Sequence, residues 1–211
     1  ALLCASPALV APARAASLRV LIERPDGAPL QDALVYATPA IPVRPSGPLR
    51  AVIDQIHRQF VPRVSIVETG TLVDFPNSDN IRHSVYSFSP AKTFDLKLYA
   101  GRSAQPVLFD KPGLVVLGCE IHDSMVGWVL VVDTPYFART DRNGRATLAN
   151  LAPGGYTLRA WHEPMRAVSA GEVLHVGSAA PPSSIVVHLD PGPPAAPPAS
   201  MHMAHAPGLP H

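Results

Sequence analysis

Alternation of apolar and polar residues over short runs dominates the middle of the chain. Successive side chains of a strand point to opposite faces of its sheet, so this alternation predicts strands with one buried face. Gly, Pro, Asn and Asp bound the runs, and these residues favour turns. We predict strands at residues 64–67, 71–75, 83–88, 94–98, 114–117 and 128–132. With 25 prolines and little helical periodicity, the pattern favours an all-β chain whose short strands form a sandwich.

The N-terminal part contains a predicted hairpin. Leu18, Val20 and Ile22 alternate with polar residues, as in a half-buried strand. Residues 25–27 (Pro-Asp-Gly) favour a turn, and residues 33–36 have the composition of a returning strand. We therefore expect the two strands on either side of this turn to pair with each other.

A second group of turns and strands follows Asp133. Residues 141–145 and 153–155 favour turns, because they combine Asp, Asn, Pro and Gly. Residues 146–148 and 156–161 are predicted strands. His175 and His188 lie on further candidate strands, where a structural or solvated histidine is expected.

Residues 118–125 (Gly-Cys-Glu-Ile-His-Asp-Ser-Met) bring a thiol, an imidazole and a thioether into one short segment. Soft sulfur suits Cu(I), whereas nitrogen also accepts Cu(II). A thiolate, two imidazoles and a weak axial thioether form the ligand set of an electron-transfer copper site. Such a site requires one more histidine, and His83 lies far enough upstream to be on a neighbouring strand. The candidate metal ligands are therefore His83, Cys119, His122 and Met125.

Other readings of this segment are weaker. Taken separately, a cysteine or methionine is usually a core residue. The Cys119-x-x-His122 spacing could be half of a zinc site, but structural zinc requires further Cys or His partners and does not use a thioether. A c-type haem would require Cys-x-x-Cys-His, which does not occur in the sequence.

At these residues the middle third of the chain resembles the cupredoxins. The resemblance includes residues that precede His83 and residues on either side of the ligand segment 118–125. They are Phe60, Pro62, Gly70, Val73, Phe75, Asn77 and Asp79, then Pro112, Gly113 and residues 127–131. The resemblance implies a cupredoxin Greek-key β-sandwich that holds one type 1 copper. It also implies that His83, Cys119 and His122 are equatorial ligands, that Met125 is axial, and that His122 is the electron port near the surface, beside Ile121 and Val126.

Two residues depart from the cupredoxin pattern. Many members carry Asn after the first histidine, and this chain has Ser84; they often carry an aromatic residue two positions before the cysteine, and this chain has Leu117. We expect these changes to affect the redox potential and the rigidity of the ligand loop. The two-residue gap between His122 and Met125 resembles that of amicyanin. That likeness implies an amine-oxidising dehydrogenase, in methylamine use, as a possible donor and a c-type cytochrome as a possible acceptor.

Residues 49–60 carry two conflicting signals. Apolar residues recur there at helical spacing, whereas the cupredoxin resemblance makes the end of the stretch extended. We predict an extended path near Phe60 and allow a helical turn before it.

The outer parts of the chain resemble a small transthyretin-like or carboxypeptidase-regulatory-like sandwich. Its expected halves are residues 17–38 and 134–190, and the copper domain, residues 39–133, is inserted between them. A single enlarged sandwich is the alternative. Residues 191–211 are predicted to be a disordered, proline-rich tail with a cluster of His and Met residues that runs from Met201 to His211.

Residues 1–16 are apolar and end in small residues, which is typical of a truncated secretory signal. We therefore expect a periplasmic protein. Cleavage near Ala16 would remove Cys4 and leave Cys119 as the only thiol, and bound copper would account for an unpaired cysteine in an exported protein. The same cleavage would remove Arg14, so the number of basic residues would fall from 17 to 16 and equal the number of acidic residues. This balance argues against nucleic acid or a membrane surface as a partner.

The combined prediction is a periplasmic, monomeric carrier of single electrons between redox partners, without a membrane span. An enzyme is not expected, because neither the repeated His-x-His pairs of a multicopper oxidase nor a nucleophile-elbow motif occurs. The alternative function is copper handling, in which a carrier or store passes on the ion itself. A purely structural sandwich would leave the Cys119 segment unexplained.

Overall fold

The computed structural model describes residues 16–43, 49–102, 105–163, 165, 168–177 and 184–192. These residues form strands and turns and contain no helix, so the predicted all-β fold class is confirmed for the part of the chain that is described. No helix in these ranges is long and apolar enough to cross a membrane. The expected signal remnant and the His/Met tail lie outside the described residues, apart from Ala16, Pro191 and Gly192.

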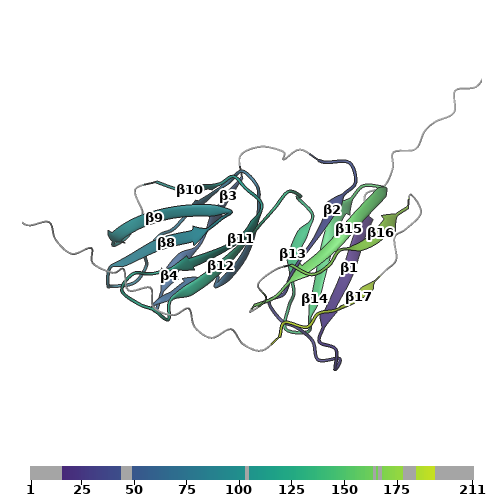
Figure 1. The fold of residues 1–211 in the computed structure, drawn as a ribbon, viewed down its shortest axis with the longest axis horizontal. Coiled ribbons are helices and arrows are strands. Elements are labelled where there is room, and N and C mark those ends of the chain that lie inside the picture. The colour runs from purple at the N-terminus through teal and green to yellow at the C-terminus, as the bar shows by residue number, and fades with distance from the viewer. Residues whose placement is uncertain are drawn as a thin grey trace, which may run out of the picture. The chain divides into compact units, whose positions relative to one another are not determined.

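The chain divides into two compact units (Figure 1). Unit 1 comprises the described residues within Ala1–Arg44, Thr134–Ala160 and Ser169–Leu189. Unit 2 comprises those within Pro45–Asp133, Trp161–Val168 and Asp190–His211.

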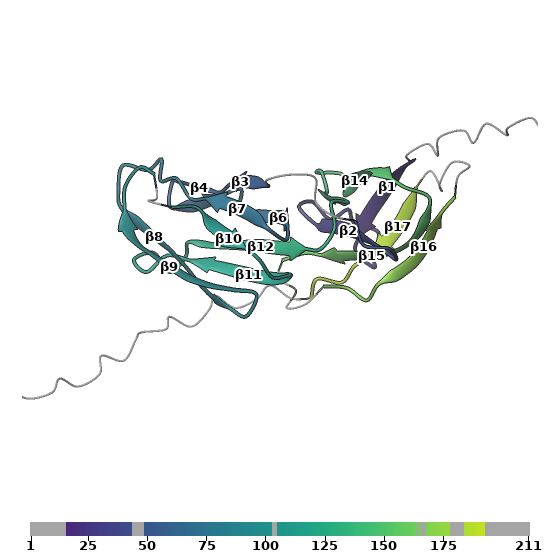
Figure 2. The same ribbon diagram turned by 90° about the horizontal axis from the view of Figure 1, so that it is seen from above.

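Unit 1 is built from two sheets, whose strands other than β13 are labelled in Figure 2. In the first sheet, β1 (Ala16–Glu23) lies between β14 (Arg145–Leu151) and β17 (Ile185–His188). β1 is antiparallel to β14 and parallel to β17. The second sheet has the order β13 (Phe137–Arg139), β2 (Leu34–Pro39), β15 (Gly154–Trp161) and β16 (Glu172–Val176). The resemblance of this unit to a transthyretin-like sandwich stays a prediction.

The predicted N-terminal hairpin is wrong, although its turn is present. The N–H of Arg24 donates to the carbonyl of Ala28 (2.8 Å), and Gly27 has φ 84°, which only glycine adopts easily. After the turn the chain passes into the second sheet, where β2 pairs with β13 instead of β1. Alternation indicates which face of a strand is buried, but it does not specify the partner strand.

Unit 2 contains a five-stranded sheet, a three-stranded sheet and a two-stranded hairpin. The five-stranded sheet has the order β6 (Val64–Glu68), β12 (Val126–Val132), β11 (Gly113–Gly118), β8 (His83–Ser89) and β9 (Lys92–Tyr99). The three-stranded sheet has the order β10 (Val107–Phe109), β7 (Thr71–Asp74) and β3 (Arg50–Val52). The hairpin consists of β4 (Asp54–Ile56) and β5 (Gln59–Val61).

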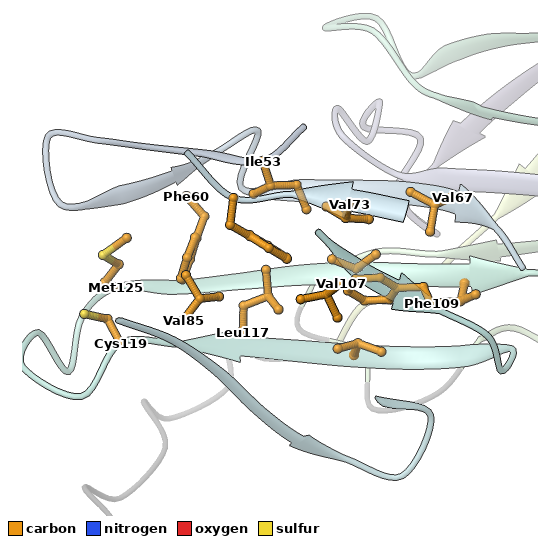
Figure 3. Close-up of a cluster of buried hydrophobic side chains, with 14 residues drawn as sticks. Ile53, Phe60, Val67, Val73, Val85, Val107, Phe109, Leu117, Cys119 and Met125 are labelled. Atoms are coloured by element: carbon orange, nitrogen blue, oxygen red, sulfur yellow. The ribbon is translucent and has the colours of Figure 1, made fainter. Parts of the chain in front are cut away.

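The core of unit 2 lies between these strands, as Figure 3 shows. Phe75 is central in it, since its ring lies 5.7 Å from that of Phe94 and 6.4 Å from that of Phe109, measured between centroids. Phe60 is also buried and packs where Gly127 leaves room, because a Cβ at Gly127 would lie 3.0 Å from the Phe60 ring. This β-sandwich fits the cupredoxin-like fold predicted from the sequence.

The helical turn allowed before Phe60 does not form. Residues 50–61 form the short strands β3, β4 and β5, and the link between β4 and β5 is a tight turn at His57 and Arg58. Ile53 and Phe60 are both buried in the core of unit 2. Ile53 lies between β3 and β4, and Phe60 lies in β5, so two extended segments contribute to one core and the helical period is coincidental.

Candidate metal centre

The strands of the five-stranded sheet bring the candidate ligands together at one end. His83 is the first residue of β8, and Cys119 directly follows β11. These strands are neighbours, with Gly118 opposite Tyr86, so the start of β8 meets the end of β11. His122 lies in the loop that connects β11 with β12.

The thiol of Cys119 lies between the two imidazoles. Its Sγ atom is 3.8 Å from Nδ1 of His83 and 3.9 Å from Nδ1 of His122. The ligand atoms of the three residues all lie within 4.8 Å of one another, and the two ring centroids are 4.9 Å apart. His83 and Cys119 are buried, and His122 is partly buried. The structure thus brings together three of the four residues that the sequence named, each with a donor atom toward a common centre.

Met125, the fourth residue, is buried in the core of unit 2 together with Cys119. Figure 3 shows both sulfur-containing side chains at the same end of the core. The backbone N–H of Met125 donates to the carbonyl of His122 (2.9 Å), which closes the ligand loop with a tight turn. Axial ligation by Met125 stays a prediction.

Ser84 tethers the ligand loop at the position where many cupredoxins have Asn. Its hydroxyl oxygen accepts a hydrogen bond from the backbone N–H of Glu120 (2.8 Å). Its O–H faces the Cys119 Sγ atom at 3.7 Å, a weak hydrogen bond to sulfur. The shorter side chain therefore holds both the loop backbone and the thiol.

Asp79 fixes the orientation of His83, a role that the sequence did not reveal. The Oδ2 atom of Asp79 lies 2.7 Å from Nε2 of His83. The hydrogen bond from the backbone N–H of Arg58 is the main cause that lowers the pKa of Asp79 to about 2, so the group is a carboxylate at neutral pH and only accepts. In the neutral form of His83, Nε2 therefore carries the proton and the lone pair of Nδ1 faces Cys119.

The environment of His122 favours a neutral imidazole. Burial lowers its pKa, and the nearby His83 and Arg58 lower it further, while Asp79 acts in the opposite direction. A neutral ring keeps a nitrogen lone pair for a metal. The preceding residue, Ile121, is 51% exposed and forms an apolar surface beside the histidine.

Tyr86 covers the backbone next to the thiol, a contact that no sequence pattern predicted. A Cβ at Gly118 would lie 2.6 Å from Cζ of Tyr86, so only glycine allows this close approach. Burial raises the pKa of the Tyr86 phenol, and Asp123 and Cys119 raise it further. The ring also contacts Phe88, at 5.2 Å between centroids.

The donor set of this centre fits copper. One unpaired thiol and two imidazole nitrogens face a common, largely buried point. Thiolate and imidazole are ligands that copper accepts in both oxidation states. The bond from His83 to Asp79 supplies the outer partner that metal-bound histidines usually have.

No protein-family model and no curated protein matches the chain. Among solved structures, it is similar to a copper-containing nitrite reductase from Thermus scotoductus SA-01, with 25% identity and a TM-score of 0.39. That match covers 45% of this chain and 26% of the reductase, so the chain spans about a quarter of that protein. A purple cupredoxin from Nitrosopumilus maritimus is 20% identical, with a TM-score of 0.34, over 40% of this chain and 99% of its own. A variant of amicyanin in its reduced state is 19% identical, with a TM-score of 0.37, over 46% of this chain and 99% of its own.

Proposed function

We propose that this protein binds one copper ion and carries single electrons between redox partners. The observation that carries the proposal is the convergence of Nδ1 of His83, Sγ of Cys119 and Nδ1 of His122 within 4.8 Å. These residues would hold copper equatorially, as a type 1 site, with Met125 on the axial side. When bound, copper supplies the one-electron change between Cu(I) and Cu(II).

The protein residues keep the ligand geometry fixed. Asp79 holds the ring of His83, and Ser84 holds the backbone of the loop at Glu120. The buried Cys119 thiol is shielded from water by the core of unit 2. A site held in this way needs little rearrangement when the charge of the ion changes, which favours rapid electron exchange. His122, beside the exposed Ile121, offers the route to a partner.

The proposed partners are redox proteins, with an amine-oxidising dehydrogenase as donor and a c-type cytochrome as acceptor. The proposed location is the periplasm, and the proposed state is a monomer. This part of the proposal rests on the apolar N-terminal residues and on the short spacing between His122 and Met125.

Copper titration of the metal-free protein tests the proposal. We expect one Cu(II) per chain and an intense visible absorption band from the thiolate–copper bond. Electron self-exchange should be measurable without loss of the ion. A colourless Cu(II) complex, or four-coordinate zinc bound more tightly than copper, would contradict the electron-transfer role. If the protein instead passes its ion to an acceptor chelator faster than it exchanges electrons, copper handling is the function.

Replacement of Met125 tests its axial position. An axial thioether stabilises Cu(I) over an oxygen donor. Met125→Gln should lower the reduction potential and Met125→Leu should raise it, each on the order of 60 mV, which corresponds to a tenfold change in relative affinity for the two states. Voltammetry of the two copper-loaded variants measures both shifts. Unchanged potentials in both would show that Met125 does not face the ion.

A further inference from the structure

The β4–β5 turn has an unusual backbone for its residues. Ile56 pairs with Gln59, so His57 and Arg58 form a two-residue hairpin turn. Both have positive φ, at 52° and 58°. A turn with two such residues favours Asn and Gly. In the left-handed region a Cβ atom crowds the backbone, which glycine avoids and the short polar side chain of asparagine tolerates. Neither residue is glycine, so the turn needs support from elsewhere.

The carboxylate of Asp79 supplies that support. Its Oδ1 atom accepts the backbone N–H of His57 (2.7 Å), and its Oδ2 atom accepts the backbone N–H of Arg58 (2.8 Å). Asp79 is itself anchored, since its N–H donates to Oδ1 of Asn77 (3.0 Å). Asn77 is buried and donates through Nδ2 to the carbonyl of Tyr99 (2.9 Å).

The same carboxylate also contacts a candidate metal ligand. The Oδ2 atom that accepts the Arg58 N–H lies 2.7 Å from Nε2 of His83. His83 is completely buried and begins β8, in a different sheet from the β4–β5 hairpin. One oxygen atom thus joins the strained turn to the imidazole whose other nitrogen faces Cys119.

We propose that Asp79 is a positioning residue that couples the β4–β5 turn to His83. The two N–H groups of the turn hold the carboxylate in place, and the carboxylate holds the His83 ring with its proton on Nε2 and its Nδ1 lone pair toward the metal centre. A carboxylate partner makes imidazole a more basic ligand, which favours the more highly charged Cu(II). Because coupling is reciprocal, a metal on His83 should also stabilise the turn. The effect on copper rests on the proposed function, whereas the effects on the turn and on the His83 proton exist without metal.

Asp79→Asn is the main test, because asparagine has nearly the same shape. Its side-chain oxygen can still accept a turn N–H, but its NH₂ group cannot accept the His83 Nε2 proton. Loss of such an outer partner reduces metal affinity about 10–100-fold. We expect the loss to be larger for Cu(II) than for Cu(I), and each tenfold difference raises the potential by about 59 mV. In the metal-free variant, ¹⁵N NMR should show that His83 no longer holds its proton on Nε2 alone.

His57→Gly separates positioning from general stability. Glycine adopts positive φ freely, so this change should stabilise the turn in both the parent protein and the Asp79→Asn variant. In the double variant we expect the unfolding midpoint to recover while the raised potential and the altered His83 tautomer remain. Recovery of the potential together with stability would overturn the proposal, since Asp79 would then act only through folding.

Hydrogen exchange in the unmodified protein supplies a test that does not depend on how a variant folds. The N–H groups of His57 and Arg58 should exchange more slowly when Cu(I) or a redox-inert metal such as zinc is bound, and the difference should vanish in Asp79→Asn. Equal exchange with and without metal would overturn the coupling. If the parent binds no copper but Asp79→Asn still shifts the His83 proton and exposes the turn, the positioning role stands and the proposed copper function fails.

Discussion

Replacing Cys119 by serine should abolish the intense visible band of the copper-loaded protein and weaken copper binding by more than about 100-fold, beyond the loss expected for an outer partner of a ligand. The reason is chemical, because a thiolate is the soft donor in this centre and a serine hydroxyl stays protonated at neutral pH. Serine is close to cysteine in size, so the buried site next to His83 and His122 is otherwise kept. Absorption spectroscopy and competition with a copper chelator measure the two effects.

Ser124→Ala is a suitable control for this experiment. Ser124 lies in the same loop and is exposed, so its replacement should leave both the band and the affinity unchanged. A Cys119→Ser protein that keeps the band would show that the colour arises from another group. The assignment of the thiol as a metal ligand would then be wrong.

Replacing Phe75 by alanine should destabilise unit 2 by about 3–5 kcal/mol, the usual loss for a large aromatic residue removed from a core. Phe75 is completely buried and contacts the rings of Phe94 and Phe109, so the change leaves a cavity lined by aromatic residues. Small domains have a stability of only about 5–15 kcal/mol. The variant should therefore unfold at a much lower urea concentration.

The measurement requires metal-free protein, because a bound ion would add its binding free energy to the stability of the folded state. Amide exchange of β11 and β12 residues under increasing urea reports on unit 2 alone. Phe88→Ala is the matched control. Phe88 is 63% exposed and contacts Tyr86, so about 1 kcal/mol or less should be lost. Equal losses in the two variants would show that Phe75 is not central to the core.

Local sequence patterns were sufficient to predict the strands that carry the metal centre. β8, β11 and β12 each alternate or run apolar between turn residues, and their predicted and observed bounds differ by at most two residues. The short strands β3, β4, β10 and β13 were missed, because three residues are too few to show a period. The partner of β1 was wrong because strand pairing depends on residues far along the chain, here those of β14 and β17.

The candidate ligands could be named from the sequence because their chemistry is distinctive and three of them are close in the chain. The residues that hold them could not. Asp79 and Tyr86 have ordinary side chains, and their roles depend on contacts with His83 and Gly118 that form only in the folded protein. Ser84 could be named as a departure from the cupredoxin pattern, but its contact with Cys119 could not. Hydrogen bonds across loops have no sequence period, so they are visible only in three dimensions.

The discontinuous layout of unit 1 has a consequence for the order in which the protein matures. β1 and β2 are synthesised first, but their partners β13 to β17 come only after the whole stretch that contains β3 to β12. Unit 2 can thus complete its sheets while the nascent chain still holds Leu18, Val20 and Ile22 without their sheet neighbours. These residues are buried in the finished protein. During synthesis this segment would therefore need protection by a chaperone, and a chain that stops at residue 133 would leave these residues permanently exposed to aggregation.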